Sequence, residues 1–194
     1  MKLIVACNRS QANETSYQVV WDTITGRPLH NAIVWSDTRT QKLVHELRRV
    51  DGANKLHALS GLSLSTYPSS VKLLWLLKHI PEVRTASDEG RLAFGTVDSW
   101  LLYNLTGGAN NGVHVTDPSN ASRTMFMNIH TLEYDDFLIN WFGVGKVHLP
   151  KIVASSDPDE YSSFSGGPLA GVRITGCLGI AVTFKCFGRI DTNI

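Results

Sequence analysis

Carboxylates are the side chains from which acid–base and metal sites are most often built, and two of them stand out in this chain. Asp117 has two interpretations: it binds Mg²⁺ or a substrate, or it satisfies backbone groups in a turn together with Thr116 and Ser119. We favour the turn. Asp98 is likewise expected to cap a helix rather than to bind a ligand. These carboxylates alone therefore predict no reaction.

Cysteines and histidines offer little further chemistry. Cys7, Cys177 and Cys186 are widely spaced and odd in number, so they predict neither a metal motif nor a disulfide framework, which fits a reducing compartment. The seven histidines show no ligand spacing, and we expect no metal site made of protein side chains alone. The net charge of +1 suggests neither a nucleic-acid partner nor a membrane surface, and no segment is long enough to span a bilayer.

The stretch Tyr67–His79 predicts a helix with one apolar stripe facing a core. Lys72 and Lys78 are expected to be solvated charges on that helix. The residues assigned to the stripe are Val71, Leu74, Trp75 and Leu77–Lys78.

Strands and helices are mixed in the rest of the chain, which predicts an α/β or α+β domain. Turn signals at Thr25–Pro28 predict that the two flanking strands pair, and Ser155–Gly167 reads as an exposed loop. The expected strands are Leu3–Cys7, Tyr17–Trp21, Ala32–Trp35, Thr124–Asn128 and Val172–Leu178. The expected helices are Thr40–Val50, Glu82–Gly90 after Pro81, Thr96 or Asp98 to Leu105, and Asp135–Phe142. With 194 residues and 43% hydrophobic residues, the chain can form one domain with a core.

The order of residues around the helical stripe resembles a signature of the FGGY carbohydrate kinases: Tyr67, a small residue two positions later, Lys72 and then Trp75. Further blocks follow in the order typical of the glycerol-kinase branch of that family, and the resemblance runs from Asn8 to about Gly179. The blocks are Asn31–Thr40, Gly61–Tyr67, Phe94–Leu102, Leu105–Gly108, Val115–Thr124 and Gly176–Gly179.

The resemblance implies a fold of two ribonuclease-H-like, actin-like ATPase domains with the site between them. Residues 1–179 resemble part of the first domain, an incomplete α/β domain, and residues 180–194 form a divergent tail. The implied activity is phosphorylation of glycerol to glycerol 3-phosphate with ATP and Mg²⁺ in the cytoplasm. Glycerol or a similar polyol is the expected partner, and members of the family form homo-oligomers.

The resemblance also suggests residues for the acceptor. Trp35 is a candidate wall for the carbons of glycerol, although a Trp at a strand end is more often plain core. Tyr67 is a candidate hydroxyl contact, and it also suits packing against Val71 at a helix start.

An Arg–Glu pair, which grips two glycerol hydroxyls in the family, has only a partial counterpart here. Glu14 matches the Glu, but Asn13 stands where the Arg belongs, and Arg9 lies beside the matching Asn8. Glu14 and Arg9 are therefore substrate-binding candidates, and the alternative is a surface loop without a role.

The parts that would perform the transfer are missing from the resemblance. The family places an Asp, its catalytic base, after the Gly-Cys-Leu-Gly segment, where this chain has Ile180, and an aliphatic side chain accepts no proton. The family's two phosphate loops match no segment of the chain. We expect the isolated chain to be inactive, as a truncated kinase remnant or a polyol-binding fragment.

Overall fold

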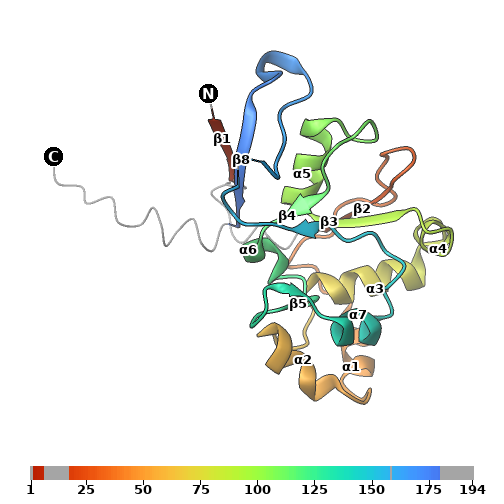
Figure 1. Ribbon diagram of the computed structural model, residues 1–194. Helices are drawn as coiled ribbons and strands as arrows, with labels where there is room; N and C mark the ends of the chain where they lie inside the picture. Colours follow the sequence, from red (N-terminus) through yellow and green to blue (C-terminus); the bar gives the residue numbers. More distant parts are fainter. Residues whose placement is uncertain (1, 7–17, 158, 180–194) are drawn as a thin grey trace.

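The computed structural model describes residues 2–6, 18–157 and 159–179, in which helices and strands are mixed along the chain (Figure 1). The helices are α1 (Gln41–Leu47), α2 (Ala53–Ser60), α3 (Ser69–His79), α4 (Pro81–Asp88), α5 (Val97–Thr106), α6 (Pro118–Ala121) and α7 (Asp136–Phe142), with a 3₁₀ turn at Gly167–Leu169. The strands are β1 (Lys2–Ala6), β2 (Gln18–Asp22), β3 (Leu92–Thr96), β4 (Val115–Thr116), β5 (Met127–Asn128), β6 (Glu133–Tyr134), β7 (Lys151–Ile152) and β8 (Arg173–Leu178).

The centre of the molecule is the antiparallel pair of β2 and β3, which join although α1 to α4 lie between them in the sequence. Every residue of both strands is buried. Since side chains alternate across a strand, Val20 and Phe94 enter one core while Trp21 and Ala93 enter another. The pair is therefore covered on both faces.

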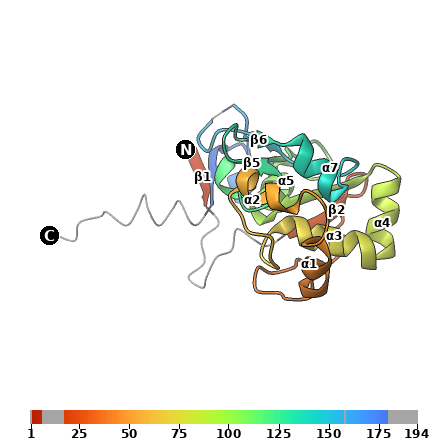
Figure 2. The same cartoon turned by 90° about the horizontal axis from the view of Figure 1, so that it is seen from below.

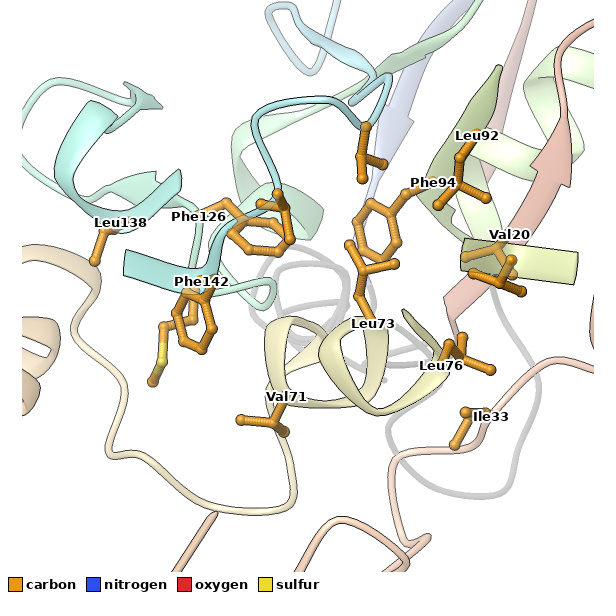
Figure 3. Close-up of a cluster of buried hydrophobic side chains, with 14 of the residues drawn as sticks. Val20, Ile33, Val71, Leu73, Leu76, Leu92, Phe94, Phe126, Leu138 and Phe142 are labelled. Carbon is orange, nitrogen blue, oxygen red and sulfur yellow. The ribbon is translucent and has the colours of Figure 1, made fainter. Parts of the chain in front are cut away.

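The larger core lies between this pair and the helices α3 and α7 (Figure 3). Phe126 is fully buried there and makes edge-on contacts with Phe94 and Phe142, at centroid distances of 5.7 and 5.8 Å. Leu73 and Leu76 of α3 pack into the same cluster. Such edge-to-face aromatic contacts add to the apolar burial and link α7 to the strand pair through Phe126.

The opposite face of the strand pair is covered by α5, which Figure 1 shows on the other side of β3 from α3. Trp21 is fully buried there, with the rings of Trp100 and Tyr103 at 5.0 and 5.3 Å. His114 packs edge-on against Trp21 at 4.9 Å, and burial lowers its pKa to about 4, so it is neutral at pH 7.

The parallel strands β1 and β8 lie at one end of the molecule and α4 at the other, as both cartoon views show (Figure 2). A second core joins β8 to α5 and β4 and includes Tyr161, Phe164 and Ile174. The expected exposed loop at Ser155–Gly167 is thus wrong in part, because Tyr161 and Phe164 of this segment are buried.

Several expected elements are confirmed. Pro81 is the first residue of α4, Asp135 caps α7 with its side chain, and Gly143 ends α7 in the left-handed conformation. β1 and β8 lie within a residue of their predicted bounds. These elements carry their start and stop signals locally.

The predicted pairing of Tyr17–Trp21 with Ala32–Trp35 is confirmed only in part. β2 pairs as a strand with β3, and the segment after β2 forms no strand but joins it through the antiparallel bridges Trp21 to Pro28 and Gln18 to Ile33. The N–H groups of Asp22 and Leu29 add hydrogen bonds to the carbonyls of Arg27 and Val20. Pro28 has no N–H to extend a ladder. The expected strand at Thr124–Asn128 shortens to Met127–Asn128.

Candidate functional site

Tyr67 is held at three points by two cations. It is half-buried and stands two residues before α3. The guanidinium carbon of Arg123 lies 4.9 Å from its ring centre, and Arg123 Nε donates to its Oη at 3.1 Å. Its carbonyl oxygen accepts a hydrogen bond from Lys72 Nζ at 3.2 Å. The ring, the hydroxyl and the backbone of Tyr67 are each fixed, as positioning of a ligand requires.

Lys72 was expected to be solvated, and this is wrong: it is fully buried in the first turn of α3. The helix packs against β2, α1, α4 and α7, so its buried face is wider than one stripe and includes Lys72. Burial lowers the pKa of Lys72 to about 8, and the negative charge of Asp37 partly offsets this shift. The Arg39 guanidinium in turn holds the pKa of Asp37 below its usual value.

Trp35 is half-buried in the segment between β2 and α1, two residues before Asp37. Because Asp37 acts electrostatically on Lys72, and Lys72 binds the carbonyl of Tyr67, the segments of Trp35 and Tyr67 converge on one buried cation. Their joint contact with a substrate stays a prediction.

Three further candidates lie outside the residues that the structure describes. These are Arg9 and Glu14, the partial counterparts of the substrate-gripping pair, and Ile180, which occupies the position of the family's Asp. The tail 180–194 lies outside them as well.

Asp117 caps α6, as the turn interpretation predicts. Its Oδ1 accepts from Asn120 N and Nδ2 at 3.1 and 2.7 Å. Its Oδ2 accepts from Ser119 N, Ser119 Oγ and Ser155 Oγ at 3.1, 2.6 and 2.6 Å. Five donors thus use the lone pairs of this buried carboxylate, which ties the start of α6 to the segment after β7.

Asp98, one of the two residues expected to cap α5, is not the cap. The cap position belongs to Thr96, and Asp98 stands inside the first turn, fully buried. Its Oδ2 accepts from Thr116 Oγ1 at 2.7 Å and lies 3.8 Å from Cys177 Sγ. Burial raises its pKa to about 6.

Ligand atoms of Asp98, Asp117 and Cys177 all lie within 4.8 Å of one another, so this buried group was tested as a Mg²⁺ site. It does not fit. The Asp117 oxygens are already used by five donors, a thiol is a soft ligand, and Mg²⁺ keeps several waters that a buried group of this kind does not accommodate. The preference for a structural role of Asp117 therefore holds.

The same group fixes the end of β8. Ser119, held by Asp117, accepts a hydrogen bond from Gly179 N–H at 2.7 Å on its Oγ, and Asn120 Nδ2 lies 3.8 Å from Cys177 Sγ. Gly179 is thus anchored to the start of α6 through Ser119 and Asp117.

Replacing Asp98 with Asn is expected to remove a pH-dependent loss of stability. The unfolded carboxyl has its ordinary pKa of 3.8, so between pH 4 and 6 the folded chain binds more protons, and stability falls as the pH rises. A shift from 3.8 to about 6 amounts to about 3 kcal/mol. Urea unfolding of both forms from pH 3.5 to 7.5 measures this difference.

The control for this experiment is Asp136→Asn, an exposed carboxylate in the first turn of α7. The pH curve of Asp136→Asn should run parallel to that of the unmodified chain, so that the difference between these two curves does not change with pH. Parallel curves for the unmodified chain and Asp98→Asn would show that the buried carboxyl is ionised without penalty.

Sequence reasoning missed the partners of Tyr67. Arg123 was noted only as part of a family block, and Lys72 was placed in solvent. The signal that existed for Lys72 was its position among Val71, Leu73 and Leu76, all of them core residues. For Arg123 no local signal existed, because its contact with Tyr67 spans 56 residues of sequence.

Comparison with known proteins gives one consistent family. The profile of the FGGY family of carbohydrate kinases, N-terminal domain, matches residues 4–178. Glycerol kinase of Methylobacterium radiotolerans is 47% identical over 167 residues, 86% of this chain and 33% of that protein. Glycerol kinase of Chloroflexus aggregans is 46% identical over 176 residues, 91% of this chain and 34% of that protein. The chain spans about a third of the length of these relatives.

Comparison with solved structures gives the same family. Plasmodium falciparum glycerol kinase with ADP matches with a TM-score of 0.76 and 34% identity, over 86% of this chain and 32% of that one. The xylulose kinase from Rhodospirillum rubrum has a TM-score of 0.70 at 20% identity, over 91% of this chain and 34% of that one, and shows the fold alone.

No helix among the described residues is long and apolar enough to cross a membrane. The expected ribonuclease-H-like, actin-like α/β fold is confirmed by the kinase structures, of whose first domain the chain covers a part. The chain belongs to the FGGY family of carbohydrate kinases, within the N-terminal domain of that family.

Proposed function

We propose that these residues form the acceptor side of an ATP-dependent glycerol kinase, with glycerol 3-phosphate as the product. The observation that carries this is the cation-held Tyr67, whose hydroxyl, ring and carbonyl are each in contact with Arg123 or Lys72. The 46–47% identity to glycerol kinases supports glycerol over other acceptors.

In this proposal, Trp35 and Tyr67 both contact the bound glycerol. The indole face of Trp35 packs against the carbons of glycerol, and the Tyr67 hydroxyl exchanges a hydrogen bond with one of its hydroxyls. Arg9 and Glu14 bind further hydroxyls through charge-assisted hydrogen bonds.

ATP and Mg²⁺ are required by the proposed reaction, and no segment of this chain resembles the phosphate loops of the family. Asp98, Asp117 and Cys177 do not fit the metal. Phosphoryl transfer depends on holding the nucleotide phosphates, so the nucleotide side belongs to parts of a complete kinase other than these residues. A cytoplasmic location and self-association, as in the family, are part of the same proposal.

A second candidate function is a polyol-binding fragment without catalysis. Ile180 favours it, because this position holds the proton-accepting Asp in the family. The two functions share the acceptor pocket and differ only in turnover.

Glycerol binding by the purified chain tests the acceptor pocket, with saturation-transfer NMR as the measurement. Tyr67→Phe is expected to weaken binding about fivefold, since one net hydrogen bond contributes about 1 kcal/mol. Trp35→Ala is expected to weaken it about tenfold through lost packing. The control is Trp141→Phe. The Trp141 indole N–H donates to the Asp51 carbonyl, and the variant should bind glycerol as the unmodified chain does.

Equal binding by all of these variants would contradict the pocket assignment. Stronger saturation by xylitol or gluconate than by glycerol would instead assign a different acceptor.

A further inference from the structure

Arg123 stands on a backbone that is fixed from two directions. Its N–H donates to the Asn120 carbonyl at 3.0 Å, which attaches it to α6 and hence to the cap formed by Asp117. The next residue, Thr124, accepts at its carbonyl from Ser70 N–H in the first turn of α3, at 3.0 Å. The guanidinium therefore approaches Tyr67 from a rigid support that is hydrogen-bonded to the same helix that Tyr67 precedes.

The contact between Arg123 and Tyr67 has a direction. A guanidinium is always charged and only donates, so Arg123 Nε occupies a lone pair of the Tyr67 hydroxyl. The phenolic proton then has to point toward another acceptor. The ring is contacted at the same time by the guanidinium, whose carbon lies 4.9 Å from the ring centre, which limits the rotation of the ring.

Lys72 completes the arrangement from the backbone side. Its Nζ donates to the Tyr67 carbonyl at 3.2 Å and fixes the main chain of Tyr67, while Arg123 orients the side chain. A hydroxyl that is already acceptor-bound to a cation is a stronger donor to the next oxygen in line, because hydrogen bonds in a chain polarise one another.

We propose that Arg123 is a positioning residue that presents the Tyr67 hydroxyl to the acceptor alcohol as a hydrogen-bond donor, with Lys72 fixing the backbone of Tyr67. This inference rests on the proposed function for the identity of the alcohol. It assigns Arg123 a role that acts wholly through Tyr67.

A double-mutant cycle tests that dependence. Arg123→Met is expected to weaken glycerol binding about threefold in the unmodified chain, less than the fivefold loss for Tyr67→Phe, and to have almost no effect in the Tyr67→Phe chain, because a positioning residue has nothing left to position. Arg123→Lys should recover only part of the affinity, since an ammonium does not reproduce the contact with the ring and the Nε donor together.

Arg48→Met is the matched control, because Arg48 also binds the segment before α3, through the Leu64 carbonyl at 3.1 Å, but does not touch Tyr67. It should leave glycerol binding within twofold of the unmodified chain. An equal loss for Arg123→Met in both backgrounds would overturn the proposal and make Arg123 a general structural residue.

A second arm needs no ligand. The chain has five tyrosines, so a sample labelled with ¹³C at the tyrosine ζ carbons gives few signals, and Tyr67→Phe identifies the one of interest. Arg123→Met is expected to shift that signal, and Arg48→Met is not. A shift without glycerol binding by the unmodified chain would refute the acceptor but keep the positioning role; an unmoved signal would refute the positioning role itself.

Discussion

The purified 194-residue chain is expected to release no ADP when glycerol is added to it with MgATP. Ile180 follows Gly179 where the family has a carboxylate, and loss of a positioned base alone costs about a hundredfold to ten-thousandfold in rate. No segment of the chain resembles the phosphate loops, and phosphoryl transfer depends almost wholly on positioning of the nucleotide. The two deficits act on different substrates, so their effects combine.

A coupled ADP assay measures this, run beside light scattering to show that the sample is monodisperse. The glycerol kinase of Methylobacterium radiotolerans, a 47% identical relative, serves as the positive control. Ile180→Asp is the informative variant. It should remain inactive, because the nucleotide is still not held.

Glycerol-dependent ADP release by the unmodified chain would contradict the prediction and require a nucleotide site among these residues. Release only after Ile180→Asp would show that the carboxylate was the single missing part. The acceptor pocket is tested separately by glycerol binding and does not depend on either result.

The elements that the sequence predicted well are those with local signals. Asp135 and Gly143 delimit α7 by their own chemistry, and Pro81 begins α4 because its missing N–H costs nothing at that position. Such signals act over one turn of chain and do not depend on the rest of the fold.

The pairing of β2 was not predictable in the same way. The turn near Gly26 indicated a local hairpin, yet β2 pairs with β3, whose approach depends on where α3 and α5 pack. Val20 and Trp21 face different cores, which a pattern of one buried face does not anticipate.

The candidate site shows the same contrast between local sequence signals and tertiary contacts. Tyr67 is predicted as a site residue from its motif, because residue order is local information, and its contact with a substrate stays a prediction. Its orientation by Arg123 is a tertiary contact, and the burial of Lys72 follows from the number of elements around α3. Arg9, Glu14 and Ile180 stay predictions from the sequence.

Lys72 is expected to make the chain more stable at alkaline pH, relative to a variant that lacks the charge. Its pKa falls from 10.5 in the unfolded chain to about 8 in the folded one. Between these values the unfolded chain binds more protons, so stability rises with pH through this window and is lost as the pH falls back through it. The shift amounts to about 3 kcal/mol.

Lys72→Met is the reference for this measurement, because Met has a similar unbranched shape and no charge. The free energy of unfolding in urea, taken at intervals from pH 7 to 10.5, should rise for the unmodified chain relative to Lys72→Met by about 3 kcal/mol. Ionisation of tyrosines in the unfolded chain affects both proteins equally and cancels in the difference. Lys78→Met removes an exposed cation from the same helix and should give a constant difference.

A constant difference for Lys72→Met as well would mean that the buried ammonium is fully compensated by Asp37 and its other surroundings. The expected slope would instead show that the chain retains an uncompensated charge in its interior. A buried charge that destabilises the fold requires a reason, and the ammonium of Lys72 donates a hydrogen bond to the carbonyl of Tyr67. The loss of stability on lowering the pH would then measure what fixing Tyr67 costs the fold.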